Sequence, residues 1–144
     1  MKHLFSALLL LCLALPLTAH AAGEAPKAKL LFVSTTGLED LGTLSSSFRH
    51  AIAATRSQHV EDVVWIGYGR AIVAFDPTVE AVPASVREQA QAALTSGVKL
   101  KVCAEALRKY GIDPKKIEPK AEVVANAIDE VARLVAQGYQ VINY

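Results

Sequence analysis

Cys103 is the residue whose type and position point most clearly to chemistry. Residues 98–102 (VKLKV) alternate apolar and basic side chains, as a strand with one wetter face does, and residues 104–110 are typical of a short helix. Free backbone amides at a helix start favour an anion, and the thiolate is the nucleophilic form of cysteine. Position alone supports a reactive thiol and a buried packing cysteine equally well.

The other candidate site residues are those expected near this thiol if Cys103 ends a strand of a parallel sheet. The carboxyl ends of parallel strands meet at one edge, where functional groups gather. Glu105 would oppose any positive charge there. Loop residues at this rim are also explained as simple connectors. The candidates for supporting charge are Lys101, Arg108 and Lys109, and those for the rim are Thr35, Thr36, Gly67 and Gly69.

Several familiar kinds of cysteine site do not fit the sequence. Residues 103–109 (CAEALRK) place Arg108 one position too early for a C-x₅-R anion loop and contain no glycine, and the chain has no C-x-x-C pair. His50 or His59 could act as the base of a Cys–His pair, although isolated histidines are more often solvated or packing residues. The spacing of these residues predicts no metal site, and nothing predicts a cofactor.

Composition limits the class of protein. The chain has 144 residues, of which 52% are apolar, and 15 Lys+Arg stand against 14 Asp+Glu. That length predicts one domain, and the apolar content is too high for a disordered chain. The near-zero net charge does not favour a nucleic-acid partner.

The first residues are typical of a cleavable secretory signal peptide, and we do not expect them to belong to the folded domain. Lys2 and His3 precede a leucine-rich run that ends at Leu17, and small residues at 19 and 21 follow. The run is shorter than the ~20 residues of a transmembrane helix. We expect cleavage after Ala21, which removes Cys12, then a flexible leader at 22–29 and an exported, periplasmic or secreted domain at 30–144 with no membrane anchor.

The mature chain alternates strand and helix patterns. Apolar runs predict strands at 30–33, 63–66, 98–102, 122–125 and 139–144, and helices are expected at about 39–56, 85–96, 104–110 and 127–137. Residues 70–83 are ambiguous. This order predicts a single three-layer α/β/α sandwich with a parallel sheet of about five strands.

Local signals refine the two later long helices. Residues 85–88 (SVRE) fit a capping box, and Asn126 is expected to cap the last helix. That helix is expected to place Ile128, Val131, Ala132 and Val135 on one apolar side.

Residues 98–112 (VKLKVCAEALRKYGI) resemble the DsrE/DsrF-like sulfur-relay family, in which a strand ends in a cysteine and a small-residue helix with Gly-Ile follows. Residues 63–67 (VVWIG) and 138–142 (GYQVI) resemble two further strands of that family. The resemblance implies a five-stranded sandwich, a homo-oligomer (trimer or hexamer), and a role for Cys103 as a carrier that accepts sulfur as a persulfide.

The resemblance therefore implies a sulfurtransferase-type carrier with a sulfur donor or acceptor protein as partner. The main alternative is a non-catalytic binding or assembly module in which Cys103 is structural. A phosphate or nucleotide binder at the strand rim has only the fold class in its favour.

Overall fold

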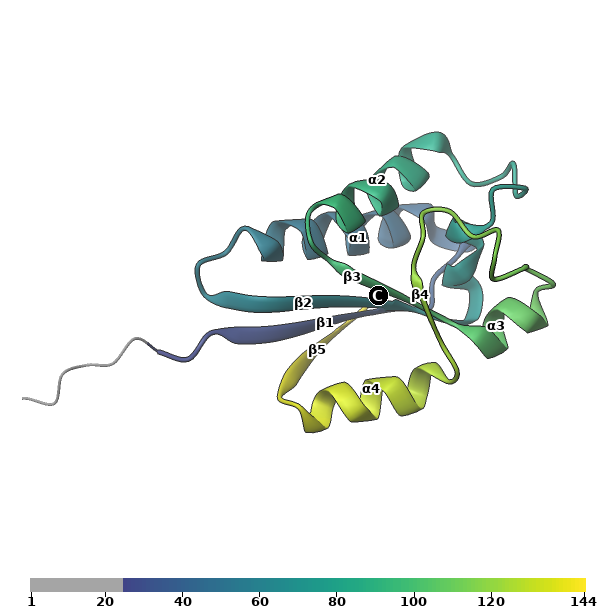
Figure 1. Cartoon of the computed structure of the whole chain (residues 1–144). Coiled ribbons are helices and arrows are strands. Elements are labelled where there is room, and N and C mark those ends of the chain that lie inside the picture. Colours follow the sequence, from purple (N-terminus) through teal and green to yellow (C-terminus); the bar gives the residue numbers. More distant parts are fainter. Residues whose placement is uncertain (1–24) are drawn as a thin grey trace, which may run out of the picture.

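The computed structural model describes residues 25–144, so the expected signal peptide at 1–21 lies outside the described part. A single sheet forms the middle layer (Figure 1). All five strands are parallel, in the order β4-β3-β2-β1-β5. Their bounds are β1 Ala28–Ser34, β2 Val60–Gly67, β3 Lys99–Cys103, β4 Glu122–Val124 and β5 Tyr139–Asn143.

Helices cover both faces of this sheet. Figure 1 shows α1 and α2 together on one side and α4 on the other, with α3 beyond the carboxyl end of β3. The helices are α1 Leu41–Thr55, α2 Ala84–Thr95, α3 Ala104–Lys109 and α4 Ala127–Ala136, with short 3₁₀ helices at Leu38–Asp40 and Gly69–Phe75. No helix within residues 25–144 is long and apolar enough to cross a membrane.

The aromatic part of the core lies between the sheet and the α1–α2 layer. Trp65 of β2 is fully buried, and its indole stacks on Phe48 of α1 with ring centroids 4.5 Å apart. The indole Nε1 donates to Ser47 Oγ at 2.9 Å, so its polar atom is paired inside the core. Phe75 closes the cluster with its ring centroid 5.6 Å from that of Trp65. This packing fixes the carboxyl end of β2, next to the end of β3.

The three-layer sandwich is confirmed, and some expected boundaries move. β1 begins at Ala28, inside the expected leader, because Ala28 N donates to His59 O at 2.8 Å. The ambiguous stretch 70–83 holds the 3₁₀ helix Gly69–Phe75 followed by turns. The expected capping box is wrong: α2 begins at Ala84 after Pro83, which leaves Ser85 and Glu88 inside the helix rather than around its first amides.

The last helix matches one expectation and departs from another. Asn126 Oδ1 accepts from the backbone amides of Ile128 and Asp129, so it caps α4 as expected. The side that faces the sheet is buried at Ala127 and Leu134, however, whereas Ile128 and Val135 are exposed. The expected apolar side of α4 is thus turned mostly to solvent. Ala127 and Leu134, each one position before an exposed residue of that side, pack against the sheet instead.

Candidate functional site

Cys103 is the last residue of β3 and the residue immediately before α3. Its position at the strand end agrees with the sequence prediction. Cys103 is only 6% exposed, and its thiol is free. It nevertheless lines a surface cavity of about 210 Å³ at the carboxyl edge of the sheet. Cys103 is therefore mostly covered by protein but forms part of the wall of this cavity.

Residues from three separated parts of the chain form this cavity. They come from the segment after β2, from α3, and from the start of α4, so the ends of β2, β3 and β4 all contribute, as expected for a parallel sheet. Of the predicted residues, the cavity brings together Cys103, Gly69 and Lys109. Its full lining is Tyr68, Gly69, Cys103, Glu105, Ala106, Lys109, Asn126, Ala127 and Ile128.

The cavity carries one charged side chain of each sign. Lys109 lines it as a cation and Glu105 as an anion. Asn126 Nδ2 donates to Glu105 Oε2 at 3.2 Å, which ties this carboxylate to the cap of α4. The remaining walls are mostly apolar. Such a site has no strong net charge. Of the three residues expected to supply positive charge near Cys103, only Lys109 lines the cavity, and Glu105 opposes it as expected.

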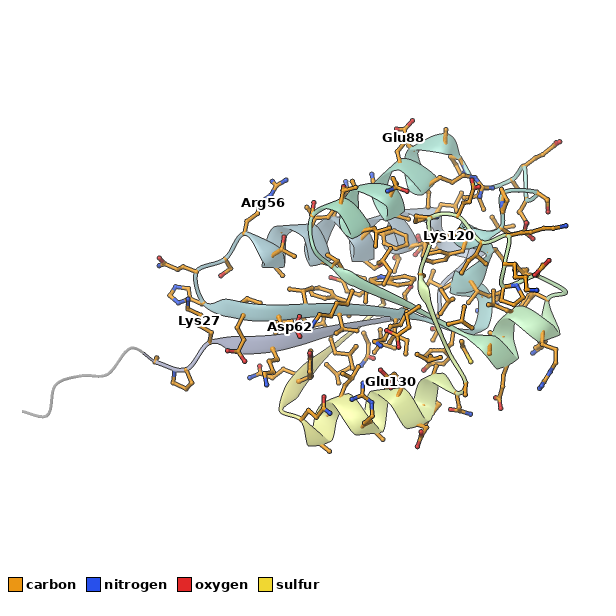
Figure 2. All side chains as sticks on the ribbon, in the orientation of Figure 1. Lys27, Arg56, Asp62, Glu88, Lys120 and Glu130 are labelled. Atoms are coloured by element: carbon orange, nitrogen blue, oxygen red, sulfur yellow. The ribbon has the colours of Figure 1, made fainter. Side chains whose placement is uncertain are left out.

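Lys101 has a different role from the one expected. It lies on the same face of β3 as Cys103, two residues before it, but its Nζ is bound by Glu122 Oε2 at 2.5 Å and by Glu130 Oε1 at 3.0 Å. Lys101 is 6% exposed, so the expected wetter face of this strand is exposed at Lys99 but buried under α4 at Lys101. Figure 2 shows Glu130 on α4 beside the sheet. Lys101 therefore anchors α4 instead of supplying free charge to the thiol.

Glu130 makes this anchor sensitive to acid. Hydrogen bonds from Arg133, and then from Lys101, outweigh the opposing effect of burial and lower the pKa of Glu130 from 4.5 to about 2. The folded state therefore favours the ionised carboxylate, and this stabilisation is complete above pH 4.5 and is lost as the pH falls towards 2. We expect the free energy of unfolding to fall by about 3 kcal/mol over this interval from Glu130 alone. Urea unfolding at a series of pH values measures it, and Glu130→Gln should flatten the slope; an equal slope in that variant would contradict the assignment.

The other predicted residues lie outside the cavity. Arg108 lines a separate cavity of about 370 Å³ on another side of α3. Thr35 is exposed, and its backbone amide donates to Tyr144 O at 3.1 Å, which ties it to the segment after β5. Thr36 is half-buried beside it. Within residues 25–144, none of these three residues lines the cavity that contains Cys103.

Neither histidine is placed to act on the thiol. His50 lies in α1, on the opposite face of the sheet, where its Nδ1 is 2.5 Å from Tyr144 Oη. His59 precedes β2, at the amino end of the strands. Residues 25–144 hold no cluster of three potential metal-ligating side chains.

Gly67 serves the packing of Trp65 and does not line the cavity. A Cβ at Gly67 would lie 2.5 Å from Trp65 Cη2 and 2.7 Å from its Cζ3. The indole cannot move aside because Phe48 and Phe75 hold it. Gly69, two residues on, has φ of +59°, a left-handed conformation that favours glycine. The two glycines thus shape the segment that carries Tyr68 into the cavity.

We expect Gly67→Ala to lower the free energy of unfolding by about 1–3 kcal/mol, because the added methyl overpacks a rigid core. Gly42→Ala is the matched control. Gly42 lies in α1, where a Cβ meets only Asp40 Oδ1 at 3.3 Å, and alanine is the better helix former. Urea unfolding compares them; equal stability of G67A and the unchanged protein would rule out the packing role.

Tyr68, Asn126 and Ile128 line the cavity but were not predicted from the sequence as site residues. One signal was available for Asn126, because it directly follows the strand predicted at 122–125 and so belongs to the same edge as Cys103. No local signal marks Ile128, since its apolar side chain was expected to face the core. Tyr68 lies between two glycines, and this short pattern favours a turn rather than a binding site.

The arrangement defines an α/β/α sandwich with a free cysteine at the end of a central parallel strand, set beside a small cavity. The sequence profile of the DsrE/DsrF-like family matches residues 28–144. The chain belongs to this family, which confirms the resemblance drawn from the short motifs around Cys103, Trp65 and Tyr139. No curated protein sequence matches the chain.

Solved structures share the fold at low sequence identity. The ychN protein from E. coli is 18% identical, with a TM-score of 0.68 over 81% of this chain and 99% of that one. MTH1491 from Methanobacterium thermoautotrophicum, a protein of unknown function, is 16% identical, with a TM-score of 0.64 over 82% and 99%. BT1422 from Bacteroides thetaiotaomicron, a conserved protein also of unknown function, is 17% identical, with a TM-score of 0.63 over 81% and 94%.

Proposed function

We propose that this protein is an exported sulfur carrier that holds sulfane sulfur as a persulfide on Cys103. Membership of the DsrE/DsrF-like family supports sulfur relay in general terms. The observation that carries the specific proposal is that Cys103, a free thiol at a strand end, lines a cavity. Cys12 stands in the expected signal peptide, so Cys103 is the cysteine of the mature chain.

The transfer needs no reagent beyond the donor and the acceptor. The Cys103 thiolate attacks the outer sulfur of a persulfide R–S–SH and forms a new S–S bond. The S–S bond of the donor breaks, and R–S⁻ leaves with the electron pair, which leaves Cys103–S–SH. A thiolate of an acceptor protein then attacks the outer sulfur and releases the Cys103 thiolate. Each step exchanges one S–S bond for another, so one cysteine on this chain is sufficient.

The cavity favours a compact sulfane donor. Its volume of about 210 Å³ accommodates the added sulfur atom together with a small leaving group. Lys109 provides a cation within the same walls and can pair with a leaving thiolate, whereas Glu105 is held by Asn126. A large acceptor protein must instead reach the sulfur from the mouth, where Ile128 is exposed.

Incubation with inorganic polysulfide tests the proposal directly. The intact mass of the folded protein should rise by one sulfur atom, and peptide mapping should place that atom on Cys103. Dithiothreitol should remove it. A protein that stays at its thiol mass throughout, while free cysteine in the same solution is converted, is not a carrier.

The second candidate function is a binding or assembly module, and the burial of Cys103 favours it. Alkylation separates the two. A carrier should react with iodoacetamide in its folded state, because the cavity admits a small reagent, whereas a structural cysteine should react only after unfolding. Protection equal to that of a fully buried core thiol would favour the module.

Export and self-association belong to the same proposal. The three-part pattern of residues 1–21 supports export to the periplasm or outside the cell. Exposed aliphatic side chains on α4, at Ile128 and Val135, support a homo-oligomer (trimer or hexamer), since exposed apolar residues on one helix face mark interaction surfaces.

A further inference from the structure

The two edges of the sheet differ in how well they are protected. β4 is three residues long, contains Glu122, and follows Pro119 and Lys120, which are the usual protections against strand pairing. β5 is five residues long, and residues 139–143 (YQVIN) contain no charge, proline or glycine. Within residues 25–144, β5 has a strand neighbour on one side only, and Gln140, Val141 and Asn143 are exposed.

The backbone of β5 leaves hydrogen-bonding groups at the free edge. Tyr144 N donates to Val33 O at 2.8 Å, and Tyr144 O accepts from Thr35 N at 3.1 Å, so both groups of Tyr144 point towards β1. Backbone groups alternate in direction along a strand. Those of Asn143 and Val141 therefore point away from β1, to the open side. An exposed edge of this kind is a template for another strand.

We propose that β5 pairs with β5 of a second copy of this chain across a two-fold axis, so that two sheets join into one. A two-fold axis makes the two strands antiparallel. With Val141 opposite Val141 of the second copy, Tyr139 faces Asn143, and the outward backbone groups of these residues meet in pairs. This register forms about six main-chain hydrogen bonds.

A second copy is the occupant that the edge chemistry fits best. Only uncharged side chains face one another in this register, so no like charges meet across the axis. Tyr, Val and Ile are residues that favour strands. β4 is a poor partner by comparison, because it is short and carries Glu122. The contact is therefore isologous, and it closes at two copies instead of growing into a filament.

The proposal does not depend on sulfur chemistry, and it specifies an even number of subunits. It is compatible with a hexamer built as two trimers, in which β5 would join the trimers. It is incompatible with an isolated trimer. Sulfur uptake by Cys103 can be measured on the same samples, so failure of one proposal is seen separately from failure of the other.

Two valines of nearly equal exposure provide a matched pair of variants. Val141 on β5 is 39% exposed and Val123 on β4 is 38% exposed. Sedimentation velocity and light scattering of the purified full-length protein should give an even-numbered assembly. Val141→Lys should halve its mass, because two cations would face each other at the axis. Val123→Lys should leave the mass unchanged. Asn143→Lys should also halve it, because it places a charged side chain opposite Tyr139 of the second copy and a lysine on an edge strand opposes pairing.

Circular dichroism shows whether each variant is folded. If Val141→Lys fails to fold, Asn143→Lys decides, since the side chain of Asn143 is exposed. An unchanged mass in the folded Lys variants of β5 would overturn the proposal. So would a monomer or an odd-numbered assembly of the unchanged protein, or an equal loss of mass in Val123→Lys.

Discussion

Cys103→Ser should abolish the uptake of sulfane sulfur completely. A serine hydroxyl cannot form the S–S bond that stores sulfur, and the described part of the chain contains no other cysteine to replace it. After incubation with inorganic polysulfide, intact-mass spectrometry should show the gain of one sulfur atom in the unchanged protein and none in the variant. The effect is all-or-none because the reacting atom itself is removed.

The control for this result is Cys12→Ser. Cys12 belongs to the expected signal peptide, so this variant should still take up one sulfur atom per chain. Serine is close to cysteine in size and Cys103 is nearly buried, so circular dichroism and urea unfolding should show a folded protein. Uptake that persists in Cys103→Ser would assign the sulfur to another group and defeat the carrier proposal.

If Cys103 takes up sulfur as proposed, its burial has a consequence for the choice of donor. Because Cys103 is only 6% exposed, the proposed reaction would take place through the cavity rather than from open solvent. The donor must therefore fit beside Tyr68, Ala106 and Ile128 before the sulfur atoms meet. Selectivity for small donors then follows from shape. A thiol at an open loop would lack this selectivity.

Much of the fold was predictable because its signals are local. Buried parallel strands are continuous apolar runs, and the glycines at 97, 111 and 138 end α2, α3 and α4 in positive-φ conformations, as their places in the sequence indicate. The position of Cys103 at a strand end was predictable for the same reason. It follows directly from the pattern of residues 98–103.

The surroundings of Cys103 were less predictable because they depend on distant partners. Lys101 looks like a solvated residue of an alternating strand, and only the positions of Glu122 and Glu130 make it a buried anchor. The apolar pattern of α4 fits two orientations that differ by about one residue, or about 100° around the helix. Packing against the sheet chose the one that exposes Ile128, and Ile128 then became part of the cavity.

Glu130→Gln should lower the free energy of unfolding at neutral pH by about 3 kcal/mol, whereas Glu122→Gln should lower it by less than about 1 kcal/mol. Both carboxylates contact the same Lys101 Nζ, which makes them a matched pair. They differ in burial: the Glu130 side chain is 12% exposed and that of Glu122 is 63% exposed. Water replaces the lost partner at Glu122 but reaches the Glu130 position poorly. Urea unfolding of the two variants measures the difference, and equal losses would contradict the burial argument.

Lys101→Met separates the two causes of such a loss. If Glu130→Gln destabilises the protein because it leaves a buried ammonium group poorly compensated, removing that charge as well should restore part of the stability, since methionine fills a similar space without a charge. The double variant should then be more stable than Glu130→Gln alone. If the loss instead came from the contact between Glu130 and Arg133, Lys101→Met would add a further loss. Sulfur uptake should be unchanged in the double variant, because Lys101 is bound to carboxylates and supplies no free charge to Cys103.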